Sequence, residues 1–219
     1  MRVVITGTAQ GIGFYTALMF LEMGHEVIGL DIKNAPEELL QMEGYVHHVV
    51  NVRCQWMLPD IHDVDILVNN AGVQDEMLNI SVNLVGTINV TEKYALQPSI
   101  KSILNVTSVS AHNGAEYPRY TASKGGVLAY TKWLAQEVAK YGATANSISP
   151  GGVITPMTQE IWNDGDKRSA VLQETLLGKW ASSAEIAQWI YFVTVINKSM
   201  TAQDIIIDNG ETAKYNFIQ

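Results

Sequence analysis

The stretch TGTAQGIG, residues 6–13, lies between a short apolar run and a stretch with helical character. At the start of a helix, unpaired backbone N–H groups can bind the phosphates of a nucleotide. Gly7 allows the tight turn, Gly11 lets the backbone approach a pyrophosphate, and Gly13 allows close helix packing. A strand, a glycine-rich turn and a helix in this order predict an α/β fold that begins with a dinucleotide-binding unit.

An acidic residue follows this turn at the distance expected for a dinucleotide site. Asp31 ends the apolar run VIGLD, eighteen residues beyond Gly13. From the end of a second strand, its carboxylate can accept hydrogen bonds from the adenosine ribose hydroxyls, and it would repel the 2′-phosphate of NADP. Asp31 therefore favours NAD, although Lys33 could partly offset the repulsion. An aspartate that only faces water at a strand end is the alternative.

Short β-branched runs alternate with longer helical stretches along the rest of the chain. The strand candidates are residues 2–6, 26–31, 45–50, 64–69, 102–107, 143–148 and 204–208, and the helix candidates are residues 11–24, 76–97, 118–141 and 182–196. Several strand candidates are apolar nearly throughout, as strands covered on both faces must be. This order predicts one doubly wound α/β domain over residues 1–219, with a seven-stranded parallel sheet and helices on both faces.

Two segments depart from this alternation. Residues 51–63 are too few for a long helix with its loops, so a reduced crossover is expected there. Residues 155–180 mix apolar and polar side chains without a clear period. They could form a mobile segment that covers the substrate, or helices packed against the edge of the core.

Composition and charge exclude several classes of function. The formal net charge is −8 and no cluster of Lys and Arg occurs, which argues against a nucleic-acid partner. The apolar residues 3–7 are too few for a signal peptide or a membrane span, so we expect a cytoplasmic protein without a membrane partner. Cys54 is the only cysteine, so the chain has no internal disulfide. We expect no catalytic metal, because the histidines lack ligand spacing: His25, His47, His48, His62 and His112.

A series of motifs in this order resembles the short-chain dehydrogenase/reductase family, in its single-domain Rossmann-like form. The motifs are TGTAQGIG at 6–13, NNAG at 69–72, Asn83 in SVNLVGT, VTSVSA at 106–111, YTASK at 120–124, SPGGVITPM at 149–157 and DIIIDNG at 204–210. They span nearly the full length of the chain. Three residues separate Gly7 from Gly11, which is similar to the dehydrogenase/reductase branch of the family.

The resemblance implies four catalytic residues. Tyr120 would be the acid/base, Lys124 its partner, Ser108 the hydroxyl that binds the carbonyl, and Asn83 the support for a proton-relay water. A free phenol has a pKa of about 10, so Tyr120 needs a nearby positive charge to act as a base at neutral pH. The loop before Tyr120 is slightly short against the family pattern, and Thr107 and Ser110 are therefore rivals for the role of Ser108.

The resemblance also implies a set of cofactor-binding residues. These are Gly7, Gln10, Gly11, Ile12, Gly13, Asp31, Ile32, Asn51, Val52, Asn70, Ala71, Gly72, Tyr120, Lys124, Pro150, Gly151, Val153 and Thr155. The family commonly has Asp-Val after the third strand, where this chain has Asn51 and Val52. An asparagine can still accept a hydrogen bond from adenine and can also donate one.

The implied activity is an NAD-linked oxidoreductase that interconverts a secondary alcohol and a ketone by hydride transfer. Two alternatives remain: a dinucleotide-binding redox sensor without turnover, and an enzyme similar to 3-oxoacyl-carrier-protein reductases. A sensor could lose the four catalytic residues, whereas this chain keeps them. The resemblance also implies a homodimer or homotetramer, with Leu84, Val127 and Trp133 as interface candidates.

Overall fold

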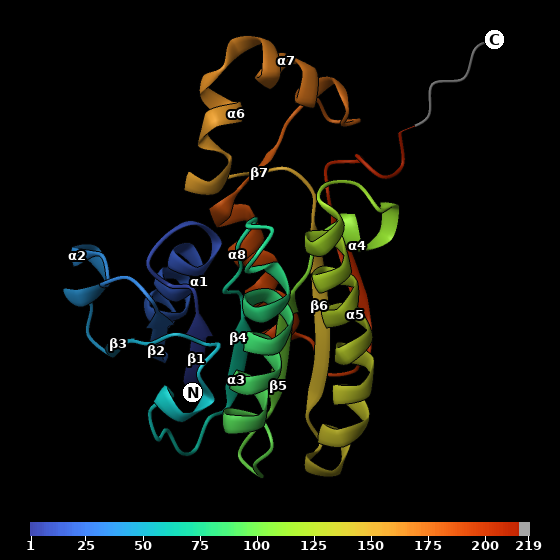
Figure 1. Cartoon of the computed structure of the whole chain (residues 1–219). Coiled ribbons are helices and arrows are strands. Elements are labelled where there is room, and N and C mark those ends of the chain that lie inside the picture. Colours follow the sequence, from blue (N-terminus) through green and yellow to red (C-terminus); the bar gives the residue numbers. More distant parts are fainter. Residues whose placement is uncertain (215–219) are drawn as a thin grey trace.

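The computed structural model describes residues 1–214 and has a seven-stranded parallel sheet at its centre (Figure 1). The spatial order is β3-β2-β1-β4-β5-β6-β9. The strands are β1 Arg2–Thr6, β2 Glu26–Asp31, β3 Tyr45–Val49, β4 Ile66–Asn69, β5 Ser102–Val106, β6 Thr144–Pro150 and β9 Asp204–Ile207. The order reverses between β1 and β4, and ligands of open α/β sheets bind outside the carboxyl ends of the strands at such a switch point.

Helices cover both faces of this sheet. Successive side chains of a strand point to opposite faces, so Val3 and Ile5 enter one core cluster and Val4 enters the other. The first cluster includes residues of α1 (Gly11–Glu22) and α8 (Ser183–Tyr191), and the second includes residues of α3 (Thr87–Tyr94) and α5 (Pro118–Val138). The predicted seven-stranded parallel sheet with helices on both faces is confirmed.

The helix expected over residues 76–97 is shorter and begins as a π-helical segment. Ile80–Gly86 is π-helical and leads directly into α3. Before it, the Asp75 carboxylate accepts hydrogen bonds from the backbone N–H groups of Met77 and Leu78 at 2.9 and 3.1 Å, which forms a turn in place of a first helical turn. Segments of π-helix occur frequently at functional sites, and this one carries Asn83.

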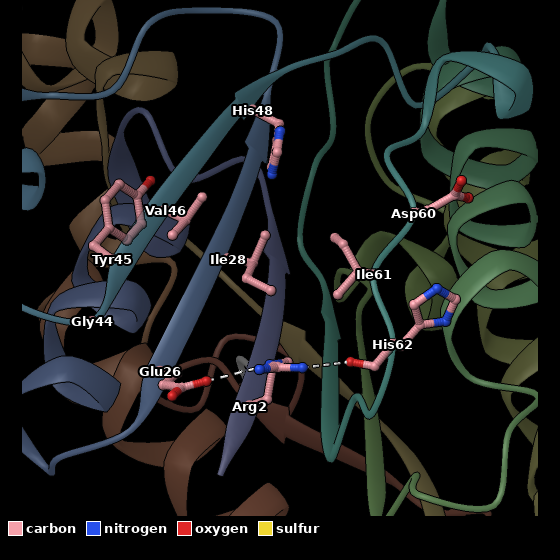
Figure 2. Close-up of a pocket in the computed structure, with 10 residues that line it drawn as sticks. All are labelled: Arg2, Glu26, Ile28, Gly44, Tyr45, Val46, His48, Asp60, Ile61 and His62. Carbon is pink, nitrogen blue, oxygen red and sulfur yellow. Dashed lines mark hydrogen bonds and ion pairs between the residues drawn. The ribbon is translucent and has the colours of Figure 1, made fainter.

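The crossover between β3 and β4 is reduced, as the short segment 51–63 predicts. It contains one 3-10 turn, Gln55–Met57, and the preceding α2 is a single turn, Glu37–Leu40. Beside it, a groove of about 600 Å³ lies over the first strands (Figure 2). Arg2 crosses the groove floor, donating to Glu26 Oε2 at 3.3 Å and to the His62 carbonyl oxygen at 2.9 Å. This groove shares no lining residue with the predicted catalytic set.

Residues 155–180 form an excursion whose two ends are held together. The short strands β7 (Val153–Ile154) and β8 (Ala181–Ser182) pair in parallel at its base. Between them, a 3-10 turn (Pro156–Thr158), α6 (Gln159–Asn163) and α7 (Gly165–Gln173) project beyond the sheet (Figure 1). Because α6 and α7 bury none of their residues fully, they do not pack as core helices against the sheet edge.

The exposure of side chains on and beside α5 changes the set of residues that could form the predicted interface. Val127 is 1% exposed and belongs to the chain's own interior. Leu84 packs against Gly126, where an added Cβ would lie 2.8 Å from Leu84 Cδ2. Val127 therefore serves intramolecular packing, Leu84 is partly buried, and Trp133 is 45% exposed and stacks on Tyr130.

Within residues 1–214, no helix has both the length and the apolar character needed to cross a bilayer.

Candidate active site

The phosphate turn has the backbone geometry that its glycines predict. Gly7 and Gly11 have φ values of +77° and +58°, in the left-handed region that favours glycine. A Cβ on Gly13 would lie 2.0 Å from the Gly7 carbonyl oxygen, so α1 can begin this close to β1 only with glycine at that position. The first turn of α1 thus presents free N–H groups next to a turn without side-chain bulk, which fits a pyrophosphate.

Asn70 stabilises this turn from the neighbouring strand end. Its Nδ2 donates to the Thr6 and Gly7 carbonyl oxygens at 3.0 and 3.3 Å, and the backbone N–H groups of Asn70 and Ala71 donate to Thr6 Oγ1. Asn69 is buried and donates to Thr91 and Asn105, so it braces the sheet. The side chain of Asn70 therefore supports the phosphate turn.

The carboxylate of Asp31 lies beside the same turn. Its Oδ2 accepts a hydrogen bond from the Ala9 N–H and its Oδ1 from the Lys33 N–H, both at 2.9 Å. The Lys33 ammonium reaches across to Gln10 Oε1 at 2.8 Å. The predicted acidic residue and the phosphate turn are thus in direct contact, and Lys33 is part of the same polar group.

The other predicted adenosine contacts follow β2 and β3. Ile32 is 64% exposed next to Asp31. Asn51 uses its Oδ1 to accept the Arg53 N–H at 3.1 Å. Val52 is buried, and its Cγ2 lies 2.6 Å from the position that a Cβ on Gly86 would occupy. Val52 therefore also fixes the π-helical segment against the core.

Tyr120 and Lys124 lie in the first two turns of α5, after Pro118 at the helix start. The Lys124 ammonium is buried, donates to the Val106 carbonyl oxygen at 3.0 Å, and lies 5.7 Å from the centre of the Tyr120 ring. Ser123 between them donates to the Tyr120 carbonyl oxygen at 2.7 Å. An ammonium has three donors, and this buried one has a single protein acceptor among the described residues.

Asn83 approaches the same place from the π-helical segment. Its Oδ1 accepts the Val73 N–H at 2.8 Å, and its Nδ2 donates to the Val73 carbonyl oxygen and to Ser123 Oγ at 3.0 and 3.1 Å. A Cβ on Gly72 would lie 3.4 Å from both Asn83 Oδ1 and Lys124 Nζ. Gly72, Asn83 and Lys124 therefore meet, although they come from three segments of the chain.

Three hydroxyl groups follow β5, and their surroundings differ. The Ser108 hydroxyl lies near Tyr120 and lowers the pKa of the phenol, and its oxygen accepts a hydrogen bond from the Ser110 N–H at 3.2 Å. The Thr107 hydroxyl is occupied by the Ile148 carbonyl oxygen and Ser149 Oγ, both at 2.6 Å. Ser110 is fully buried, and its hydroxyl has no partner within residues 1–214. Ser108 is thus the one of the three whose hydroxyl influences the phenol.

Burial controls the protonation of the Tyr120 and Lys124 pair. It raises the pKa of Tyr120 to about 12, and the Glu116 carboxylate adds to this rise. It also lowers the pKa of Lys124 to about 8, which Glu116 opposes. Desolvation of the phenolate therefore dominates the pKa of Tyr120 in this structure, in which the Lys124 ammonium is directed at Val106.

The segment after β6 closes toward the phosphate turn. Pro150 ends β6, the Gly151 N–H donates to the Ile207 carbonyl oxygen at 3.0 Å, and Val153 is 6% exposed. The side chain of Thr155 lies 3.6 Å from the position of a Cβ on Gly11. Residues 150–155 therefore extend from the end of β6 to the start of α1, across the carboxyl ends of the strands.

Sequence reasoning missed three polar residues near this place: Gln74, Glu116 and Glu211. Gln74 Nε2 donates to Glu116 Oε2 at 2.8 Å, and Glu211 Oε2 accepts the Gly152 N–H at 3.2 Å. Nothing in their local sequence distinguishes them from surface residues. Only the folded chain brings them beside Tyr120 and residues 150–155.

No group of three or more His, Cys, Asp or Glu side chains within residues 1–214 is arranged to hold a metal ion. The described site contains a phosphate turn at the switch point of a parallel sheet, an acidic residue at the end of β2, and a buried lysine beside a tyrosine and a serine. A fold and site of this kind define a dinucleotide-dependent oxidoreductase of the Rossmann type.

Comparison with known proteins gives the family. The short chain dehydrogenase family profile matches residues 1–166, and the chain belongs to this family. It is an NAD(P)-dependent oxidoreductase that acts on CH–OH or keto groups. The chain is 33% identical to a 3-oxoacyl-[acyl-carrier-protein] reductase of Thermotoga maritima over 94% of this chain and 96% of that protein.

Two solved structures extend the comparison. ElxO with NADP bound is 25% identical, with a TM-score of 0.87 over 97% of this chain and 99% of that one. A 4-hydroxyisoleucine dehydrogenase complexed with NADH is 26% identical, with a TM-score of 0.86 over 98% and 99% of the two chains. Relatives of this fold thus use either form of the nicotinamide cofactor.

Proposed function

We propose that this protein catalyses the NAD-linked interconversion of a secondary alcohol and a ketone, with Tyr120 as the acid/base. The observation that carries the proposal is the meeting of Ser108, Tyr120 and Lys124: the serine hydroxyl lies near enough to lower the pKa of the phenol, and the lysine ammonium lies 5.7 Å from the ring centre. Asn83 holds the loop at Val73 and contacts Ser123 within α5.

Each residue then has a chemical task. The Ser108 hydroxyl binds the oxygen of the substrate, and the Tyr120 oxygen takes its proton during oxidation or returns it during reduction. The Lys124 ammonium stabilises the phenolate by its charge. Asn83 supports the water through which the proton reaches solvent.

The residues present fit a nicotinamide dinucleotide. The phosphate turn has no room for a side chain at Gly13, and the buried Lys124 ammonium has donors left for ribose hydroxyls. When bound, this group accepts or supplies the hydride. Residues 150–155 would hold the nicotinamide carboxamide, and Gly7, Gly11 and Gly13 would hold the pyrophosphate.

NAD is the proposed form because of Asp31. Its carboxylate lies against the phosphate turn at Ala9, where the charge would oppose a ribose 2′-phosphate. The Lys33 ammonium is bound to Gln10, so it is also close to this position and reduces the discrimination. Steady-state rates with NADH and NADPH, measured with one substrate, test this choice.

The substrate is to be sought with a panel of alcohols and ketones, assayed by nicotinamide absorbance. A second candidate, reduction of a 3-oxoacyl carrier protein, is favoured by the 33% identity to the Thermotoga maritima reductase. The net charge of −8 gives this chain no basic excess with which to attract an acidic carrier. A 3-oxoacyl thioester in the panel, offered free and on a carrier, separates the two candidates.

We also propose that residues 155–180 cover the bound substrate and that the protein is a homodimer or homotetramer. The covering role of residues 155–180 is supported by their position, because the segment begins at Thr155, beside Gly11. The assembly rests on the exposed apolar side chains Ile80, Val85 and Trp133 near α3 and α5. Light scattering at micromolar concentration tests it, and a mass equal to that of one chain would contradict it.

A further inference from the structure

Glu116 has a backbone conformation that a non-glycine residue rarely adopts. Its φ is +72°, in the left-handed region, two residues before α5 begins. The neighbouring Ala115 is held from both sides: its N–H donates to Asn113 Oδ1 at 2.9 Å, and its carbonyl oxygen accepts Thr121 Oγ1 at 2.6 Å. Backbone conformations of this kind cluster at ligand sites, because surrounding contacts must hold them in place.

The side chain of Glu116 is fixed by a different loop. Gln74, which follows the NNAG motif, donates from Nε2 to Glu116 Oε2 at 2.8 Å. The hydrogen bond joins the loop after β4, which carries Gly72, to the turn between α4 (Ser110–Asn113) and α5. Ser108 lies just before α4. A carboxylate has about four acceptor positions on its two oxygens. Gln74 uses one of them, so others remain for a ligand.

The Glu116 carboxylate lies within electrostatic reach of the reacting groups. It raises the pKa of both Tyr120 and Lys124, so its charge lies close to each of them. Arg119 is close to Glu116 in the sequence, but its guanidinium donates to the Glu76 carbonyl oxygen at 3.1 Å instead of to Glu116. Burial raises the pKa of Glu116, and the hydrogen bond from Gln74 and the charge of Lys124 oppose this rise. The Lys124 ammonium itself is already directed at Val106.

We propose that Glu116, held by Gln74, is a specificity-determining residue that binds an ammonium group on the carbon next to the reacting carbinol. This inference rests on the proposed function, because it places the substrate oxygen between Ser108 and Tyr120. An amino alcohol or amino ketone would then direct its charge to Glu116. A substrate with a carboxylate at the same position would be repelled.

If the Gln74–Glu116 hydrogen bond only joined two loops, substitution of Glu116 would have a different effect from the one expected of an ammonium site. Glu116→Gln keeps the size of the side chain and an oxygen that accepts from Gln74, and it removes the charge. A link between loops survives this change, whereas an ammonium site loses its ion pair. Glu43→Gln is the charge-matched control, since Glu43 is exposed just before β3, at the amino end of the sheet.

The test uses three alcohols that differ only beside the carbinol: 1-amino-2-propanol, propane-1,2-diol and lactate, each in both configurations, with NAD. We expect the order of kcat/KM to be amine, diol, lactate. Glu116→Gln should lower the amine-to-diol ratio roughly tenfold, since a charged hydrogen-bond partner is lost. The ratio is the readout because removing the Glu116 charge also lowers the pKa of Tyr120 and so changes the rate with all three alcohols. Glu43→Gln should leave the ratio unchanged.

Two results would overturn the inference: a native enzyme that does not prefer the amine, or an amine-to-diol ratio that Glu116→Gln does not change. Glu116→Gly provides a second variant that folds without backbone strain at φ +72° and should show the same loss of preference.

If none of the three alcohols is oxidised, the proposed alcohol oxidation fails for this substrate series, and binding decides the inference separately. Saturation-transfer NMR of 1-amino-2-propanol with the protein and NADH should then show a signal that Glu116→Gln removes. An equal signal from both proteins would overturn the inference.

Discussion

Lys124 donates a hydrogen bond from its buried Nζ to the carbonyl oxygen of Val106 at 3.0 Å. The bond ties the first turns of α5 to the carboxyl end of β5, which leads into Ser108. Tyr120 and Ser108 are therefore positioned by one contact between helix and strand, although they are separate in sequence. Substitution of Tyr120 and substitution of Lys124 should have different consequences.

Replacing Tyr120 by phenylalanine should abolish proton transfer and little else. The ring and most of its packing remain, so NADH affinity should stay near that of the native protein. Turnover should fall by roughly 10² to 10⁴, the usual contribution of a positioned acid/base. Initial rates and an NADH fluorescence titration check both parts, and near-native turnover would remove Tyr120 from the mechanism.

Replacing Lys124 by methionine should affect cofactor binding and pH dependence together. Oxidation requires the phenolate, so its rate rises with pH toward the pKa of Tyr120. Loss of the ammonium removes a charge that favours the phenolate, so that pKa rises and the rising limb moves to higher pH. The profile of kcat/KM against pH measures the shift. An unchanged profile with unchanged NADH affinity would show that the two residues are only neighbours.

Replacing Asp31 by alanine should reduce the preference for NAD. The variant loses the charge that opposes a 2′-phosphate and also the acceptor of the Ala9 and Lys33 N–H groups. NADPH use should therefore improve relative to NADH, mainly through KM. Lys33→Ala is the companion variant, and it should widen the preference for NAD. Better turnover of NADPH than NADH by the native protein would contradict the role given to Asp31.

Replacing Gly13 by alanine should disrupt the phosphate turn, because the new Cβ would lie 2.0 Å from the Gly7 carbonyl oxygen. NADH binding should be lost and the melting temperature should fall. Gly125→Ala is the control: it lies within α5 with no atom within 4 Å of the added Cβ. This change should stabilise the protein by up to about 1 kcal/mol. Equal melting temperatures for the two variants would contradict the packing argument.

Replacing Trp133 by glutamate should weaken self-association if α5 forms an interface. Trp133 is 45% exposed, so the substitution places a charge on the surface without opening a cavity in the core. Sedimentation velocity should show a smaller species than the native protein gives. Trp189→Glu on α8, at 43% exposure, is the matched control and should leave the native mass.

Much of the fold could be predicted from local pattern. The apolar runs and the intervening helical stretches indicate a parallel sheet with helices on both faces, because strands covered on both faces must be apolar throughout. The boundaries were less predictable. The helix expected from residue 76 begins at Ile80 as a π-helical segment, since the Asp75 side chain takes the N–H groups that would start an earlier turn.

The interface candidates show where local pattern is insufficient. Leu84, Val127 and Trp133 are all apolar, and nothing in the sequence indicates which of them is exposed. Contacts between α5, the π-helical segment and the core bury Val127 and place Leu84 against Gly126. Trp133 is left at the surface.

By itself, the sequence determined the phosphate turn, the acidic residue at the end of β2 and the pairing of Tyr120 with Lys124. Each depends on residue types at short separations, which local backbone geometry converts into a fixed arrangement. Only the tertiary structure decided that Asn70 supports the turn, that burial raises the pKa of Tyr120, and that Gln74 holds Glu116 beside it. These depend on desolvation and on contacts between segments far apart in the chain, which no local pattern encodes.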